Sequence, residues 1–511
     1  MKKASWLLYT LAVLKILLPY LLQNAVYEPQ RDEFLYLAEG HHMAWGYMEV
    51  PPLLSVFAWL TNLLGGGMFW IKFWPSLGGV VTYLLIGRLI LHEGGKAFAL
   101  LLAWMPFIFG SFLRLHFLFQ ANFLDVFFWT AMAYALIRYK ATNLNHYLYI
   151  FGVCMGLGML GKYSVAFYII SLFIGLLLTS DRRIFANKHL YFASAIGFLI
   201  FLPNLLWQYR HGFPVVYHMG ELQKNQLQYI SPLSFLIGQF LLFLSCLVIW
   251  LTGLISLAVN KTYRFIAWSY VIVIALLMVT HGKDYYAMGV YPILFAFGSM
   301  KIETWMQGRK YFLRFALVAV ILVLGFSTVR ISMPILPPAQ LAGLYARSHV
   351  ERFGVLRWED GKDHPLPQDF ADMLSWKEMT AKVAHAYDLL DSTEKSHTLL
   401  FCDNYGQAGA VNYYGAPYHL PPAYSDNASF LYWLPDDFYK FDNIVLLTDD
   451  QQEMEHPFIH LFRQATLVDS VTNPYARERG SLIILLKGAD STLRQMFRKK
   501  IENDKKKTSP E

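Results

Sequence analysis

The sequence predicts a mainly α-helical, polytopic membrane protein with a soluble α/β domain at its C-terminal end. Of its 511 residues, 56% are hydrophobic and only 15% are charged, which argues against an ordinary soluble protein. Charged residues account for about one residue in nine up to position 330 and for about one in four from 331 to 511. We therefore predict a membrane domain at residues 1–330 and a soluble domain at residues 331–511.

The membrane domain consists of long apolar runs separated by short polar loops. A helix that crosses a bilayer needs about 20 apolar residues, and only a helix satisfies its own backbone hydrogen bonds in hydrocarbon. The first run carries Lys15 and lacks the small-residue pattern of a signal-peptide cleavage site, so we interpret it as a retained helix. The eleven predicted helices lie near residues 5–23, 68–90, 97–113, 123–138, 146–161, 164–180, 190–208, 233–257, 265–281, 286–300 and 312–330.

The charges of the short loops predict the orientation of these helices. Lys and Arg residues stay on the cytoplasmic side of a membrane. With the N-terminus inside, the inner loops hold fifteen Lys and Arg residues and the outer loops hold seven. Because the predicted number of crossings is odd, the C-terminal domain then lies on the outer side.

The outer loops collect the polar residues that are able to carry chemistry. The first outer loop, residues 24–67, is too polar for lipid and too aromatic for a plain linker, so it predicts one or two short interfacial helices. Further outer segments, far apart in the sequence, are predicted to face the same side. They contribute Arg114, His116, Gln120, Asn122 and Asp125, then Lys162 and Tyr163, then the loop 209–231, and then Lys283, Tyr285 and Tyr286.

The C-terminal region has the pattern of a small α/β domain. Residues 377–390 fit an amphipathic helix, in which apolar side chains recur every three to four positions. Four short apolar runs, at residues 397–402, 443–448, 465–471 and 481–486, fit buried strands.

Asp32 and Glu33 form an acidic pair just beyond the first predicted helix, among Tyr27, Phe34 and Tyr36. One interpretation is a solvated pair at the membrane surface, which is the usual situation of neighbouring carboxylates. The other is a carboxylate held against apolar walls, where burial tunes its pKa for work as a general base. The sequence around the pair favours the second interpretation.

The run Asp32-Glu33-Phe34-Leu35-Tyr36 is followed by Trp45-Gly46-Tyr47-Met48-Glu49-Val50-Pro51-Pro52-Leu53. This order and spacing resemble the first-loop signature of the GT-C glycosyltransferases, in the branch that contains the protein O-mannosyltransferases and the aminoarabinose transferases of lipid A. The resemblance continues along most of the chain. Asp125 takes the place of the family's second acidic residue, and the segments 156–163, 281–286, 291–292, 404–410 and 412–415 resemble later motifs.

The resemblance implies a membrane glycosyltransferase that takes a sugar from a polyprenyl-phosphate donor. The acceptor would be lipid A, a protein or a cell-envelope glycan at the outer face of a bacterial inner membrane, with the C-terminal domain in the periplasm. Inversion at the anomeric carbon is implied as well. The partners expected are therefore the lipid donor, this acceptor and the bilayer.

The resemblance also implies roles for particular residues. Asp32 would be the general base, and Glu33 and Tyr36 would orient the site. One departure from the family concerns Val50, because better-known aminoarabinose transferases have a Lys at this position that meets the donor phosphate. We therefore assign the phosphate to Lys162, Arg114, Lys283 and Tyr285, since a departing phosphate needs positive charge or hydrogen-bond donors. Substrate contacts are assigned to Pro51, Pro52, Gln120, Asn122, Asp125, Tyr163 and Tyr286.

Other classes of function fit the sequence less well. His41, His42 and Glu49 do not make a metal site, because adjacent histidines diverge on a helix and no third ligand is evident, so we assign neither metal nor cofactor. The basic residues are spread between apolar runs, which does not indicate nucleic-acid binding. A transporter or flippase of a lipid-linked substrate is the alternative, although the halves of the chain are not alike and the charges gather on one face. A non-catalytic scaffold would not need Asp32 and Asp125 where they stand.

Overall fold

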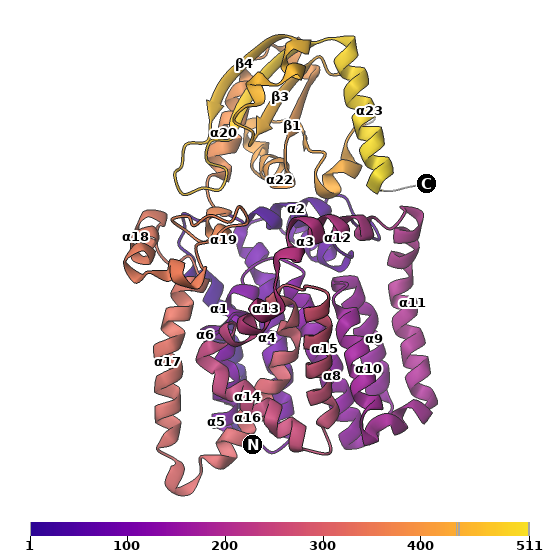
Figure 1. Cartoon of the computed structure of the whole chain (residues 1–511), viewed down its shortest axis with the longest axis vertical. Helices are drawn as coiled ribbons and strands as arrows, with labels where there is room; N and C mark the ends of the chain where they lie inside the picture. The colour runs from indigo at the N-terminus through magenta and orange to yellow at the C-terminus, as the bar shows by residue number, and fades with distance from the viewer. Residues whose placement is uncertain (1, 436, 438–439, 509–511) are drawn as a thin grey trace.

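A computed structural model describes residues 2–435, 437 and 440–508 of the chain. It shows a bundle of long helices below and a sheet domain above, with a layer of short helices between the two (Figure 1). The N-terminus lies at the end of the bundle that is remote from the sheet domain (Figure 1). This arrangement agrees with an odd number of passes through the bundle.

All eleven segments predicted as membrane helices are helical. Within the described residues, four helices are long and apolar enough to cross a membrane, or up to six if each of two bent pairs forms one span. The predicted span 97–113 is broken after Trp104, and the span 233–257 is broken at a 3₁₀ turn. The helices are α1 (Lys2–Leu22), α4 (Met68–His92), α5 (Ala97–Trp104), α6 (Pro106–Phe109), α8 (Asn122–Thr142), α9 (His146–Gly161), α10 (Val165–Leu177), α11 (Lys188–Arg210), α13 (Pro232–Leu241), α14 (Leu247–Val259), α15 (Arg264–Val279), α16 (Tyr291–Trp305) and α17 (Leu313–Ser332).

Glycines bring two of the bundle helices into backbone contact. A Cβ atom at Gly253 of α14 would lie 1.9 Å from the carbonyl oxygen of Leu294, and one at Gly298 of α16 would lie 1.9 Å from that of Ile249. Small residues permit this approach between helices that gain little from hydrophobic burial in lipid. The tight packing holds α16, and α16 in turn carries the preceding 3₁₀ segment η4 (Asp284–Val290) at its outer end.

The layer of short helices contains α2 (Arg31–Glu39) and α3 (Leu53–Leu63) of the first outer loop, for which one or two short helices were expected. A capping box starts α2: Gln30 Oε1 accepts the backbone N–H of Asp32, and Glu33 Oε2 accepts the N–H of Gln30. The layer also contains α12 (Pro214–Asn225), α18 (Pro338–Ser348) and α19 (Gln368–Ala371) (Figure 1). Three further short helices are α7 (Phe112–Leu115), η2 (Leu227–Tyr229) and η6 (Val350–Phe353).

The C-terminal domain is built on a mixed sheet of five strands in the order β2-β1-β3-β5-β4. The four predicted strands are confirmed as β1 (Thr398–Cys402), β3 (Asn443–Thr448), β4 (Phe462–Ser470) and β5 (Leu482–Ala489). β2 (Ala423–Tyr424) is only two residues long, too short for a sequence pattern. The helices are α20 (Trp376–Asp388), which was predicted, and α21 (Ser392–Ser396), α22 (Tyr405–Tyr414) and α23 (Ser491–Thr508).

Helix α2 contributes side chains to two hydrophobic cores, that of the helix bundle and that of the sheet domain. Phe34 packs edge-on against Trp376 and Tyr413 of the sheet domain, with ring centroids 5.3 and 5.6 Å away. Leu37, on another face of the same helix, is part of the large core of the helix bundle, which also extends past residue 330 into α18 and α19. The change from one core to the other therefore falls near Trp376 and not at residue 331. Through α2, the residues next to the first membrane helix touch the C-terminal domain directly.

Candidate active site

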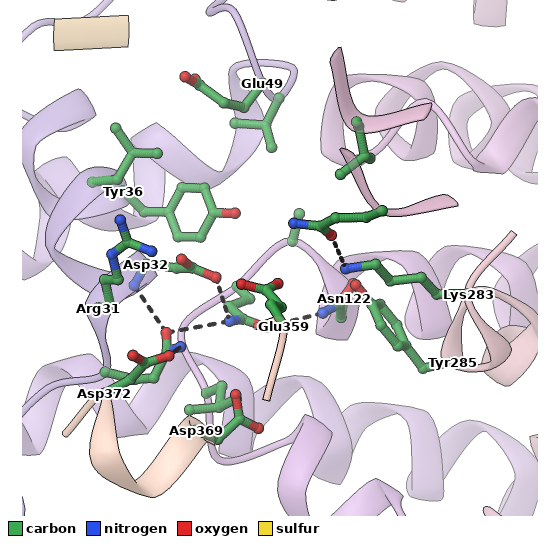
Figure 2. A pocket seen from close by; sticks show the side chains of 18 of the residues that line it. Arg31, Asp32, Tyr36, Glu49, Asn122, Lys283, Tyr285, Glu359, Asp369 and Asp372 are labelled. Carbon is green, nitrogen blue, oxygen red and sulfur yellow. Dashed lines mark hydrogen bonds between the residues drawn. The ribbon is translucent and has the colours of Figure 1, made fainter. Parts of the chain in front are cut away.

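A cavity of about 1090 Å³ lies between the outer ends of the bundle helices and the sheet domain. Side chains from α2, the segment before α8, the end of α9, η4 and the C-terminal region line it. Figure 2 shows Arg31 and Asp32 on one side of the cavity and Lys283 and Tyr285 on the opposite side. Of the residues predicted for the site, the cavity brings together Asp32, Tyr36, Arg114, Gln120, Asn122, Lys162, Lys283, Tyr285 and Tyr286.

The carboxylate of Asp32 is held by hydrogen bonds from two sides. Tyr405 donates its hydroxyl to Oδ1 at 2.7 Å, and the amide of Gln120 donates to Oδ2 at 3.1 Å. Burial raises the pKa of Asp32, while the bond from Tyr405 and the charge of Arg31 act in the opposite direction. A carboxylate with a raised pKa that remains ionised is a stronger base than a solvated one.

Tyr36 lies one helical turn beyond Asp32 on α2, and Figure 2 shows its ring beside the Asp32 carboxylate. Burial, followed by the nearby charge of Asp32, raises the pKa of Tyr36 well above its usual value. Its hydroxyl therefore stays protonated and is able to act as a hydrogen-bond donor within the cavity.

Two lysines form the cationic side of the cavity. Lys162 donates to Oδ1 of Asn122 at 2.6 Å, and its ammonium lies 4.6 Å from the ring centroid of Tyr286. Lys283 donates to Oε1 of Gln226 at 2.6 Å. Burial lowers the pKa of Lys162, the charge of Asp125 opposes this effect, and the positive charge of Lys283 adds to it. An anionic group bound between the two lysines would relieve their repulsion.

Arg114 is the third predicted phosphate ligand, and it faces a carboxylate of the C-terminal region. Its guanidinium lies 3.2 Å from Oδ2 of Asp369 and 5.0 Å from the ring centroid of Phe370. A phosphate that binds Arg114 would therefore compete with Asp369.

Glu33, predicted to act beside Asp32, points away from the cavity into the bundle. Both of its oxygens accept from the ammonium of Lys72, at 2.7 and 2.8 Å, and both residues are almost fully buried. Oε1 also accepts the backbone N–H of Phe119 at 2.7 Å. Glu33 thus ties α2 to α4 and to the segment that carries Gln120, so its contacts are those of a positioning residue.

The remaining predicted residues do not line the cavity. Asp125 is buried in the first turn of α8, and Pro51 and Pro52 are buried before α3. Tyr163 donates to Asn204 at 3.1 Å and accepts from Gln208 at 3.0 Å, which joins the end of α9 to α11. These residues support the walls of the site in this structure.

The structure adds lining residues that the sequence patterns did not single out for chemistry. Tyr405 belongs to the segment 404–410, which resembles a family motif, but the motif does not predict a contact with Asp32. The carboxylates Glu359, Asp369 and Asp372 come from the region between α17 and the sheet and had no local signal. Figure 2 shows Asp372 beside Arg31, below Asp32 in the view.

One group of potential metal ligands lies in the C-terminal domain. Among the residues that the structure describes, Asp450, Glu453 and His456 are close enough together to hold a metal ion. None of the three lines the cavity. Glu49 lines the cavity and accepts from the backbone and hydroxyl of Ser429, whereas His42 stacks on Trp433.

Asp372 predicts a dependence of stability on pH. Burial raises its pKa to about 7, against the opposing charges of Arg477 and Arg31. Because the folded protein holds this proton more tightly than the unfolded chain, the free energy of unfolding should fall as the pH rises from about 4 to about 7 and then level off. One pKa unit corresponds to about 1.4 kcal/mol, so the change is at most about 4 kcal/mol.

Thermal unfolding of the purified protein between pH 4 and pH 8 measures this effect. Asp372→Asn should weaken the pH dependence, whereas Asp363→Asn, which removes a more exposed carboxylate paired with Arg357, should keep it. Equal pH dependence in the wild type and in Asp372→Asn would contradict the prediction.

Comparison with solved structures gives the class of the fold. ArnT from Cupriavidus metallidurans bound to undecaprenyl phosphate superimposes with a TM-score of 0.62 at 11% sequence identity, over 96% of this chain and 98% of that chain. Its apo state gives a TM-score of 0.61. Arabinofuranosyltransferase AftD from Mycobacteria gives a TM-score of 0.52 at 11% identity, over 94% of this chain and 40% of that chain. The protein thus has the fold of the GT-C glycosyltransferases.

Comparison of sequences adds to the shared fold. The dolichyl-phosphate-mannose-protein mannosyltransferase family matches residues 49–207, from just before α3 into α11. The chain is thus similar to this family over less than half of its length, and it shares the fold of ArnT and AftD over nearly all of it. No curated protein matches the chain.

Proposed function

We propose that the protein transfers a sugar from a polyprenyl-phosphate donor to a hydroxyl or amine acceptor at the outer face of a bacterial inner membrane. The observation that carries this proposal is the cavity itself, in which a half-buried carboxylate, Asp32, faces two half-buried cations, Lys162 and Lys283. The carboxylate suits a nucleophile that must lose a proton, and the two lysines suit a phosphate that must leave. The presence of undecaprenyl phosphate in ArnT, which shares the fold, supports a donor of this kind.

The reaction would take place in one displacement. Asp32 accepts the proton of the acceptor as the acceptor oxygen or nitrogen forms a bond to the anomeric carbon. The bond from that carbon to the phosphate oxygen breaks, and the electron pair leaves with the phosphate. Lys162, Lys283 and Tyr285 stabilise the charge that develops there, and Arg114 joins them once the phosphate displaces Asp369. Attack from the face opposite the phosphate inverts the anomeric carbon, and no cofactor is needed.

Two features together support the location at the outer face. The loop charges favour an N-terminus in the cytoplasm, and the N-terminus lies at the end of the bundle away from the sheet domain (Figure 1). The cavity lies at the sheet-domain end, so Asp32 would face the periplasm. Labelling of a cysteine at position 32 in intact cells tests this orientation, and labelling from the cytoplasm only would contradict it.

The experiment that tests the function measures cleavage of the donor. We expect purified protein, given a labelled polyprenyl-phosphate sugar and a cell-envelope extract as the source of acceptor, to release polyprenyl phosphate and to label the acceptor. A transporter or flippase would move the lipid without breaking the sugar–phosphate bond. Movement of intact donor in vesicles, with no polyprenyl phosphate released, would therefore replace the proposal with that alternative.

A further inference from the structure

We infer that Tyr405, a residue of the C-terminal domain, is a positioning residue for the proposed base Asp32. The active site is then complete only when the C-terminal domain is docked on the helix bundle. This inference rests on the proposed function, because it assigns Tyr405 to the same site.

The two hydrogen bonds to Asp32 come from different parts of the molecule. Gln120, from the segment before α8, holds Oδ2, and Tyr405, the first residue of α22, holds Oδ1. Donors on both oxygens fix the rotation of the carboxylate about its last bond, so its orientation toward an acceptor depends on both. Tyr405 makes the shorter contact, 2.7 Å against 3.1 Å.

Three local features hold the Tyr405 side chain in this place. Asn404 caps α22 by accepting the N–H of Gln407 at 3.0 Å, which sets the direction of the first helical turn. The guanidinium of Arg31 lies 4.7 Å from the ring centroid of Tyr405. The next residue is Gly406, where a Cβ atom would lie 2.5 Å from Cγ of Arg31. A larger residue at 406 would thus push apart the two elements that carry Tyr405 and Asp32.

The charges that surround Asp32 determine what the loss of the Tyr405 hydroxyl would do. Arg31 on α2 favours the ionised carboxylate, whereas burial, Asp369 of α19 and Glu359 favour the protonated form. The hydroxyl of Tyr405 donates a stronger hydrogen bond to the charged carboxylate than to a neutral carboxyl, so it lowers the pKa of Asp32 and stabilises the base in its active state. Its removal raises the pKa of Asp32, and the acidic limb of the pH–rate profile moves to higher pH.

The chain offers a matched pair of variants for the test. Tyr405→Phe removes the hydroxyl on Asp32. Tyr413→Phe removes a hydroxyl from the same helix that also crosses between the domains, where it donates to the backbone oxygen of Gly66 at 2.7 Å. Both keep the aromatic ring, so packing is preserved in each. We expect Tyr405→Phe to move the acidic limb upward by about 1 pH unit, and so to lower kcat about tenfold at pH values on that limb, with little change in KM. Tyr413→Phe should leave the acidic limb of the pH–rate profile at its wild-type position.

Two outcomes would overturn the inference. One is a wild-type pH profile in Tyr405→Phe, and the other is an equal shift in both variants, which would mean that the hydroxyls serve only domain docking. An infrared titration measures the pKa of Asp32 without turnover. The carboxylate band that is absent from Asp32→Asn belongs to Asp32, and its change with pH gives the pKa. That band should titrate at higher pH in Tyr405→Phe than in Tyr413→Phe. If the band responds in this way while wild-type protein cleaves no donor, the proposed function fails and the hydrogen bond still holds the carboxylate.

Discussion

Asp32→Asn should lower the rate of sugar transfer by about 10²–10⁴, the usual contribution of a general base. Asparagine has the shape of aspartate but is not a base at neutral pH. Its amide oxygen is still able to accept the hydrogen bond from Tyr405, so the domains should remain docked. Initial rates of polyprenyl-phosphate release by wild-type and variant protein, at equal amounts of folded material, measure the effect.

The control for this variant is Glu28→Gln. Glu28 is a buried carboxylate of the same loop that accepts the backbone N–H of Lys377 at 2.9 Å, and it does not line the cavity. Glutamine keeps this acceptor while it removes the charge, so turnover should change little. Full activity of Asp32→Asn would remove Asp32 as the base, and an equal loss in both variants would point to a general effect of charge in the loop.

Lys72→Met should destabilise the protein by about 3–5 kcal/mol, because it leaves a buried charge without a partner. Glu33 has no solvent exposure, and the Lys72 ammonium is paired with both of its oxygens. Loss of the Lys72 ammonium should also loosen the segment that carries Gln120, because Glu33 accepts the backbone N–H of Phe119 in that segment. Thermal unfolding of purified protein and the yield of folded protein measure the effect.

Two further variants separate the buried pair from a general loss of charge. Glu33→Gln combined with Lys72→Met removes both charges and should recover much of the lost stability. Lys140→Met breaks the ion pair with Asp181, which is more exposed, and should cost less. If Lys72→Met is as stable as the wild type, the buried pair does not tie α2 to the bundle.

The pair Asp32 and Glu33 shows what a sequence motif predicts about a site and what it does not. Both residues belong to the motif, and both were predicted to act in the site. Adjacent residues of a helix point in different directions, and so Asp32 faces the cavity while Glu33 faces Lys72. The sequence did not predict Lys72 as the partner of Glu33, because a single lysine in an apolar run is only predicted to be part of a membrane helix. Only the packing of α2 on α4 shows which acid meets solvent and which meets a cation.

The sequence by itself determined the apolar helices, the four longer strands, the two short helices of the first outer loop and the set of outer polar residues from which the cavity draws. These features depend on local composition and periodicity, which a single chain displays directly. Only the tertiary structure decided that Tyr405 reaches Asp32, that Asp369 faces Arg114, and that Asp125 and Tyr163 lie behind the cavity wall. The physical reason is that such contacts join positions tens to hundreds of residues apart, and their geometry arises from the packing of whole elements, which no local pattern encodes.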